Sequence, residues 1–333
     1  MITISPDQWL NHSFNFDKSF DFISTGGSLI RFVTVSNDET HLSLVETIDE
    51  LLNKHSMWYF GANSKDSPFT KPQTIVNWLS HELPVGIDAV LKNLCKSIWK
   101  SLGVADEKII LTKDAAFHLD NDVDYLQKRF LQALNKFLGR SKIQEDLTFQ
   151  AESNLVRSFT RDFSNAVRML CLDLTMGSSS SINVFDQWLR GEKVDPKDLR
   201  NLRIMSKIGQ DNASATLRSL IALCTGSDNS TCILHLDIRA LTDPGLFSGF
   251  RGVPKASRAT RIKTYQWLRE LIDQTSLFRN TIIIVETGPE FVNISPWGNG
   301  VGIYEALKNR IIDDVLVVNQ INASAVSVEL QIG

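Results

Sequence analysis

The stretch RFVTVSNDETHLSLVETI, residues 31–48, joins an apolar strand, a short polar turn and an amphipathic helix. The strand pattern covers 29–35, and apolar residues then recur at three- and four-residue spacing from Leu42 to Leu52. In α/β nucleotide-binding proteins, a turn of this kind carries a glycine-rich loop that binds phosphate. This turn has neither glycine nor lysine. It is therefore either a plain helix start or a phosphate loop that has lost its binding residues.

The turn also carries two acids where a phosphate would bind. Its residues are Ser36, Asn37, Asp38 and Glu39, followed by Thr40 and His41. Two close unit charges of like sign repel each other by ~4 kcal/mol at an effective dielectric constant of about 20. Asp38 and Glu39 therefore oppose a bound triphosphate. On these residues alone we favour the simpler interpretation, in which Asp38 caps the helix and no ligand is needed.

Four further apolar runs complete the predicted sheet. They cover 57–62, 231–238, 281–287 and 314–321. Continuous apolar runs separated by helical patterns predict an α/β fold, with a parallel sheet covered by helices on both faces. A long helical stretch separates the second strand from the third. We predict an N-terminal segment (1–20), a first part of the α/β core (21–74), a helical insertion (75–225) and a second part of the core (226–333).

Bulk composition excludes several classes of protein. The chain has 333 residues, a net charge of −3 and 43% hydrophobic residues, so no global charge favours nucleic acid or a membrane surface. No apolar run approaches the ~18 residues that indicate a membrane span, and the first residues lack the pattern of a secretory signal. The four cysteines are widely separated, which favours neither a disulfide framework nor a zinc site. We expect a cytoplasmic protein with no membrane partner.

Two strand ends carry polar residues that suit a ligand site. The run CILHLDI reaches Asp237, the position of a magnesium-binding aspartate in ATP-hydrolysing enzymes, but Ile238 follows where a water-polarising glutamate belongs. The run TIIIVET ends at Thr287, at the edge where parallel sheets bind ligands. Each residue also has a structural interpretation, as a cap for the next loop or as part of a turn. His235, on the same strand as Asp237, is typical of a hydrogen-bonded core histidine.

A basic segment follows the third strand and contains no acid between Asp243 and Glu270. Its basic residues are Arg251, Lys255, Arg258, Arg261 and Lys263. With glycine and proline interspersed, its first half predicts a loop that could contact the phosphates of DNA or RNA, or a partner protein. The alternative is a solvated surface loop.

The order and spacing of several segments resemble a known family. They are similar to the ATP-binding P-loop proteins of BREX-type bacterial anti-phage systems, an AAA+-like ATPase group, over roughly residues 20 to 320. The segments are GGSLIRFV with THLSLVETI, FDQWLRGEKVDPKDLRNLRI, GQDNASATLRSLIALC, RIKTYQWLRELIDQT, IIIVETGPEFV and GVGIYEALKNRI.

The resemblance implies a P-loop NTPase-like sheet and assigns positions to individual residues. Asn37, Asp38, Thr40 and His41 match a degenerate phosphate loop, with Glu39 in the place of the lysine; Asp237 matches the magnesium position, Thr287 the sensor and Arg310 the trans-acting arginine. The chain departs from the family pattern where phosphate chemistry takes place. The loop glycines, the lysine and the glutamate after the aspartate are all absent, and these groups position and stabilise a transferring phosphoryl group.

The function implied by this resemblance is structural. We expect a catalytically degenerate ATPase-fold subunit that is not an enzyme, needs no cofactor and interacts with other subunits of a multi-protein defence complex. One alternative is an AAA+-like ATPase that binds ATP and Mg²⁺ through an atypical loop. The other is a nucleic-acid-binding module that contacts DNA through the basic segment.

Overall fold

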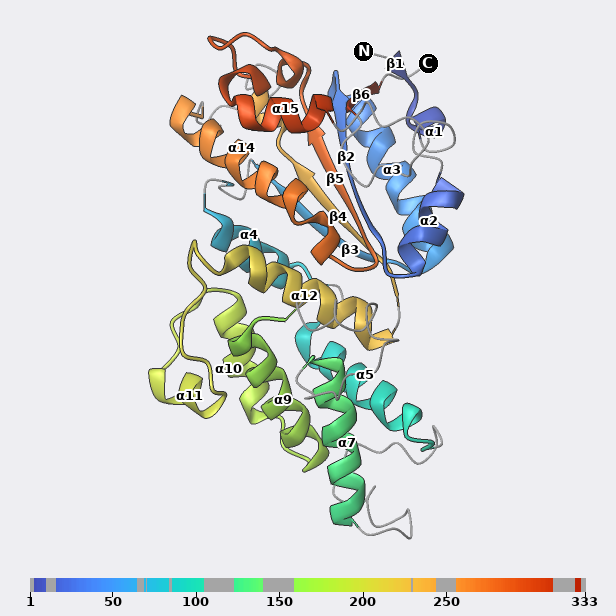
Figure 1. The fold of residues 1–333 in the computed structure, drawn as a ribbon, viewed down its shortest axis with the longest axis vertical. Helices are drawn as coiled ribbons and strands as arrows, with labels where there is room; N and C mark the ends of the chain where they lie inside the picture. Colours follow the sequence, from blue (N-terminus) through green and yellow to red (C-terminus); the bar gives the residue numbers. More distant parts are fainter. Residues whose placement is uncertain are drawn as a thin grey trace. The chain divides into compact units, whose positions relative to one another are not determined.

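The computed structural model describes residues 3–9, 16–64, 69, 71–83, 86–104, 123–139, 159–228, 230–243, 256–313 and 327–330. The chain divides into two compact units (Figure 1). The α/β unit comprises Met1–Ile75 and Ser230–Gly333, and the helical unit comprises Val76–Asn229. The helical unit is therefore an insertion in the sequence of the α/β unit. Helix α4 (Pro72–His81) contains the first boundary.

The α/β unit contains a parallel sheet, which confirms the predicted α/β class. Its described strands are β1 (Thr3–Ile4), β2 (Ser28–Val35), β3 (Trp58–Asn63), β4 (Cys232–Asp237), β5 (Thr281–Thr287) and β6 (Ser327–Leu330). They lie in the order β1-β6-β2-β5-β4-β3, and every pair of neighbours is parallel. Strands β2 to β5 lie within one residue of the predicted ranges. The predicted strand at 314–321 falls outside the described residues, and β1 and β6 were not predicted.

One face of the sheet packs against α2 (Phe16–Ser24) and α3 (Asp38–His55). Leu29 and Val33 of β2 are fully buried there with Leu44 and Ile48 of α3. Full burial of an aliphatic side chain of this size contributes about 1.5–3 kcal/mol. The apolar spacing of α3 that the sequence revealed is therefore the stripe that fixes the helix, and its first turn, against the sheet.

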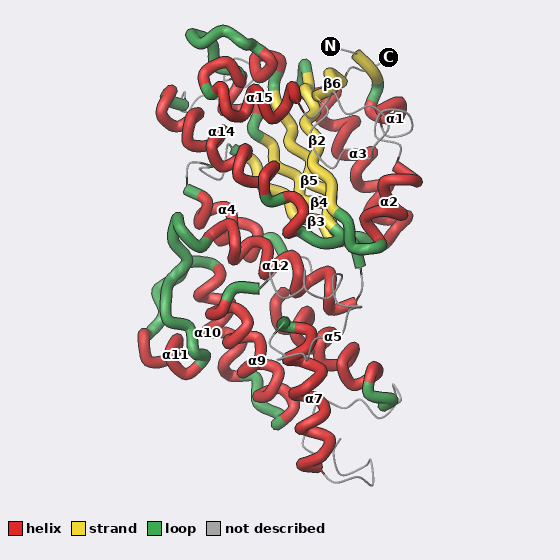
Figure 2. The backbone as a smooth tube through the Cα atoms, in the orientation of Figure 1, coloured by secondary structure: helices red, strands yellow, loops and turns green. Residues whose placement is uncertain are grey.

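The opposite face carries an aromatic cluster. Phe32 of β2 stacks on Phe291 at 5.7 Å between ring centroids, and Tyr265 meets Phe291 edge-on, also at 5.7 Å. Tyr265 belongs to α14 (Arg258–Asp273), which packs beside α15 (Glu305–Asp313) (Figure 2). The short elements of this unit are α1 (Pro6–Gln8), α13 (Arg239–Thr242), η4 (Thr275–Leu277), η5 (Pro289–Val292) and η6 (Val301–Ile303).

The helical unit is held by packed aromatic and aliphatic side chains. Phe163 meets Phe185 edge-on, with ring centroids 5.3 Å apart. Gly103 and Gly139 adopt positive φ angles of 84° and 65°, as expected of helix-ending glycines. Its described helices are α5 (Gly86–Ser101), α7 (Val123–Phe137), α9 (Arg161–Thr175), α10 (Ser180–Leu189), α11 (Pro196–Asn201) and α12 (Ala213–Asp228).

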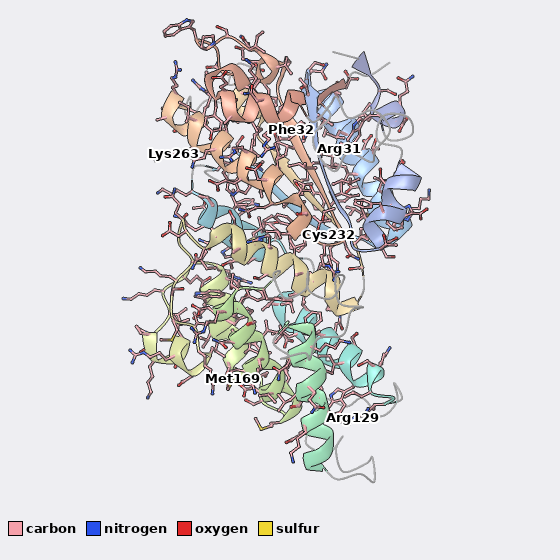
Figure 3. The ribbon with its side chains drawn as sticks, viewed as in Figure 1. Arg31, Phe32, Arg129, Met169, Cys232 and Lys263 are labelled. Carbon is pink, nitrogen blue, oxygen red and sulfur yellow. The ribbon has the colours of Figure 1, made fainter. Side chains whose placement is uncertain are left out.

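All four cysteines are buried and free, in agreement with the absence of a disulfide framework predicted from their spacing. Burial raises the pKa of the Cys232 thiol, on β4 (Figure 3), to about 12, despite a hydrogen bond with Thr281. Within the described part of the chain, no helix has the length and apolar character required to cross a bilayer.

Candidate functional site

The register of the sheet gathers polar side chains at one edge. Asp237 at the end of β4 lies directly beside Glu286 of β5, and Glu286 lies beside Val33 of β2. Side chains two residues apart on a strand share a face, so His235 lies on the same face as Asp237. This is the face that α3 covers, and the first turns of α3 supply His41. Three strands and one helix thus converge on Glu286.

Glu286 is a fully buried carboxylate surrounded by donors. His41 Nδ1 lies 2.8 Å from Oε1, His235 Nε2 lies 2.9 Å from Oε2, and Arg239 Nε lies 3.0 Å from Oε1. Burial alone would raise the pKa of Glu286. The hydrogen bonds from His235 and His41, together with the charges of His235 and Arg239, outweigh burial and lower the pKa to about 2. Glu286 is therefore ionised and accepts from both imidazoles.

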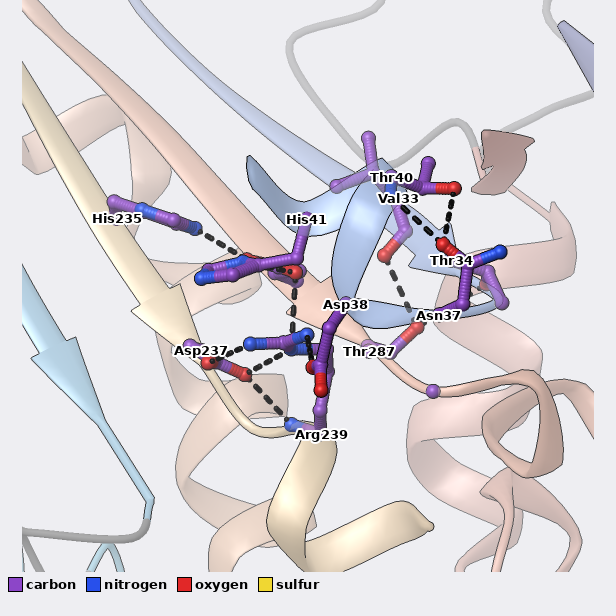
Figure 4. A network of polar contacts seen from close by, with 12 residues as sticks. Val33, Thr34, Asn37, Asp38, Thr40, His41, His235, Asp237, Arg239 and Thr287 are labelled. Atoms are coloured by element: carbon purple, nitrogen blue, oxygen red, sulfur yellow. Dashed lines mark hydrogen bonds and ion pairs between the residues drawn. The ribbon is translucent and has the colours of Figure 1, made fainter. Parts of the chain in front are cut away.

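Arg239 is the cation at the centre of this network (Figure 4). Its side chain is only 4% exposed. The guanidinium donates to Asp237 through Nε at 3.1 Å and Nη2 at 2.9 Å, and Nη1 lies 3.3 Å from Asp38 Oδ1. Because arginine presents its donors in a rigid planar fork, it suits simultaneous contact with several carboxylates. Arg239 therefore links the ends of β4 and β5 to the first turn of α3.

His235 extends the network toward β3. Its Nε2 lies 2.9 Å from Glu286 Oε2, and its Nδ1 lies 2.9 Å from the Tyr59 hydroxyl. Burial, and then the charge of Glu286, raise the pKa of Tyr59 well above its usual range. The hydroxyl consequently stays protonated and fixes the orientation of the imidazole. The prediction that His235 is a hydrogen-bonded core histidine is confirmed, and its partners make it part of the site.

Helix α3 is capped by Asn37, so the prediction that Asp38 caps it is wrong. The Oδ1 atom of Asn37 accepts from the Thr40 amide at 2.8 Å and from the Thr40 hydroxyl at 3.0 Å. Asn37 has an extended backbone (φ −157°, ψ 173°), and Asp38 is the first helical residue. Either side chain suits an N-cap, and the backbone conformation decides between them. Asp38 instead faces Arg239, while Glu39 is exposed in the first turn.

Thr287 and Arg310 have structural contacts. The Thr287 hydroxyl is fully buried and donates to the Val33 carbonyl at 3.1 Å, and it accepts from the Thr34 hydroxyl at 3.1 Å. It therefore joins β5 to β2. The guanidinium of Arg310, on α15, lies 2.8 Å from Asp273 of α14 and is half exposed.

The basic segment is only partly described. Arg251 and Lys255 fall outside the described residues. Arg258 and Lys263 are exposed, and both belong to α14, where Figure 3 labels Lys263, so this part of the segment is helical. Arg261 is 7% exposed, and its Nη1 donates to the Ala256 carbonyl at 2.6 Å. Its charged end is turned inward, which does not favour the predicted contact of Arg261 with nucleic acid or a partner.

Two central residues of the network were not singled out in the sequence. Glu286 is the one acid in the strand TIIIVET, and a charge inside so apolar a run signals a buried ion pair or a functional group. Arg239 lies two residues after Asp237 and is itself buried. Only the register of β4 and β5 reveals that these side chains meet.

The ligand atoms of His41, Asp237 and Glu286 lie within 4.8 Å of one another, close enough to consider a metal ion. The Arg239 guanidinium already binds Asp237 and Glu286. In addition, the Thr40 amide, one of the helix N-terminal donors that a phosphate would use, already donates to the Asn37 side chain. The residues present therefore do not fit magnesium-bound ATP.

The resemblance to BREX-type ATPases stays a prediction, because no family model, no curated protein and no solved structure matches this chain.

Proposed function

We propose that this protein is a catalytically inactive subunit with an ATPase-like α/β core, which acts as a structural and interaction component of a multi-protein bacterial anti-phage complex. One observation carries the proposal. The buried Arg239 guanidinium forms ion pairs with the carboxylates of Asp237 and Glu286. These carboxylates lie at the edge of the sheet where such a core would bind its metal and nucleotide.

The loop before α3 supports the same conclusion. Phosphoryl transfer depends on positioning and on positive charge around the phosphates. The loop offers Asp38, which faces Arg239, and the exposed carboxylate of Glu39. The negative charge that the sequence predicted for this loop is thus partly neutralised by the buried guanidinium of Arg239.

An interaction role is supported by a loop that presents apolar side chains to solvent. Within this loop, residues 293–302, Ile294 is 65% exposed and Trp297 is 86% exposed. Tryptophan is among the residues that contribute most to protein–protein binding. Glu290 Oε1 accepts from the side-chain amide of Asn293 at 2.6 Å and lies 3.3 Å from the Asn299 backbone nitrogen, so it contacts both ends of the loop's first part.

Glycines keep this loop compact. A Cβ at Gly300 would overlap the carbonyl oxygen of Glu290, and a Cβ at Gly302 would overlap the backbone of Ile294. Close packing of the loop on its own backbone favours a preformed binding surface, and preorganisation lowers the entropic cost of association. The alternative nucleic-acid role has less support, because among the described basic residues of the segment only Arg258 and Lys263 are exposed.

Calorimetric titration of the folded protein with ATP and Mg²⁺ tests the proposal. We expect no binding heat up to about 1 mM nucleotide, which corresponds to a binding free energy of about −4 kcal/mol, and no release of phosphate. Circular dichroism of the same sample establishes that the protein is folded. Saturable binding in the low micromolar range would favour the ATPase alternative and overturn the proposal.

A further inference from the structure

We infer that Arg239 is a built-in replacement for a divalent cation, and that it covers a latent transition-metal site formed by His41, Asp237 and Glu286. The inference deepens the proposed function, since it states what closes the inactive site. It concerns the folded protein without nucleotide.

The three side chains offer a set of atoms suited to a metal. One imidazole nitrogen and two carboxylate oxygens lie within 4.8 Å of one another. First-row metals bind such atoms at about 2.0–2.2 Å, so a small inward movement of the side chains would complete the contacts. Mixed imidazole and carboxylate ligands suit ions such as Co²⁺, Mn²⁺ and Zn²⁺.

The residues behind these ligands are arranged as in metal sites. Glu286 is held by His235, and the other ring nitrogen of His235 is hydrogen-bonded to the Tyr59 hydroxyl. The amide of Arg239 donates to Asp237 Oδ1 at 2.9 Å. Outer hydrogen bonds of this kind orient metal ligands and are commonly required for tight binding. The two carboxylates are thus held in position by groups other than the guanidinium.

The guanidinium and a metal ion exclude each other. Arg239 contacts Asp237 at 2.9 Å and Glu286 at 3.0 Å, so it binds the same oxygens that an ion would need. A second positive charge at that distance would be repelled even at an effective dielectric constant of about 20. Unlike an ion, the guanidinium is covalently attached and cannot be lost to a chelator. Through Asp38 it also holds the first turn of α3.

The decisive variant is Arg239→Met, which replaces the charged arginine with an unbranched apolar side chain. Co²⁺ is the probe, because its visible absorption reports on its ligands. We expect wild type to show no specific absorption, and the variant to bind Co²⁺ at least about tenfold more tightly, since it lacks the competing charge. We also expect Co²⁺ to raise the melting temperature of the variant and to leave that of wild type unchanged.

Two controls identify the ligands. Arg239→Lys keeps a cation, and we expect Co²⁺ binding as weak as that of wild type. Arg239→Met combined with Asp237→Asn removes one ligand, and we expect it to lose the Co²⁺ signal of the single variant. A signal retained in the double variant would place the metal elsewhere and overturn the proposal.

Three further results would overturn it: Co²⁺ binding by wild type as tight as that of Arg239→Met, a folded Arg239→Met variant that binds no Co²⁺, or an unfolded variant that Co²⁺ does not restore. An unfolded variant that Co²⁺ does restore would support it. Because no nucleotide is present, failure of this experiment leaves the ATP titration of wild type unaffected, and the converse also holds.

Discussion

Glu286 is ionised inside an otherwise apolar strand because His41, His235 and Arg239 surround it. Burial opposes ionisation of the carboxyl, but these partners lower its pKa to about 2, from an ordinary value of 4.5. A carboxyl whose pKa is lower in the folded state adds stability above its unfolded pKa and loses this contribution as pH falls. We expect the free energy of unfolding to fall by about 3 kcal/mol between pH about 4.5 and 2 on account of this group. Urea denaturation over that range measures the loss.

The matched variants are Glu286→Gln and Asp88→Asn. The first removes the titrating group, so stability should depend less steeply on pH in this range. The second removes an exposed carboxylate that pairs with Lys92 at the surface, and its pH profile should match that of wild type. Equal slopes for wild type and Glu286→Gln would contradict the assignment.

For individual residues, the sequence predicted where a residue lies in its strand better than it predicted which side chains that residue contacts. The end of β4 at Asp237 follows from an apolar run that stops at an acid. The contacts of Asp237 with Arg239 and the register beside Glu286 depend on rotamers and on pairing between distant segments. Composition and periodicity carry no information on either, so the charge-balanced network could not be predicted from the sequence.

The start of α3 can be tested at the level of the helix. Asn37→Ala removes the side-chain acceptor of the Thr40 amide, so we expect it to destabilise the protein by about 1 kcal/mol. Asn37→Ser retains a capping oxygen and should cost only a few tenths of a kcal/mol. Chemical denaturation at neutral pH compares the variants. If Asn37→Ala and Asn37→Ser unfold alike, the cap contributes little and the contact with β2 alone holds the helix.

The elements themselves were predictable to different degrees. Strands β2 to β5 are long and continuously apolar, so their positions follow from the sequence. Strand β1 has two residues and β6 has four, too few for a pattern, and both depend on pairing with a neighbour in the sheet. The first half of the basic segment was expected to be a loop and lies mostly outside the described residues. From Arg258 onward the chain forms α14, whose start is fixed by Ser257 accepting from the Thr260 amide.

The interaction role is a property of the whole molecule. Trp297→Ser removes the most exposed large apolar side chain among the described residues, so we expect a tagged protein to recover less of its native partner from the host. The melting temperature should stay the same, because exposed substitutions usually change stability by no more than about 0.5 kcal/mol. Quantitative mass spectrometry of the purified complex measures the ratio of partner to tagged chain.

Met205→Ser provides the matched control for this experiment. Met205 is also an exposed apolar residue, 78% exposed, but it belongs to the helical unit. We expect this variant to recover the partner as wild type does. Equal loss in both variants would indicate a general effect of surface hydrophobicity, and no loss in Trp297→Ser would exclude the loop as the contact.

The strand order determines when the α/β unit can form during protein synthesis. Strands β2 and β3 do not pair with each other. Strand β2 pairs with β5 and β6, and β3 pairs with β4. A nascent chain that has emerged from the ribosome only as far as residue 229 therefore contains the complete helical unit, but not one pair of neighbouring strands among those described in the sheet. The first two long strands must wait, with unsatisfied edges, for the last third of the chain. Nascent chains of this protein should accordingly depend on chaperones that shield strand edges until translation ends.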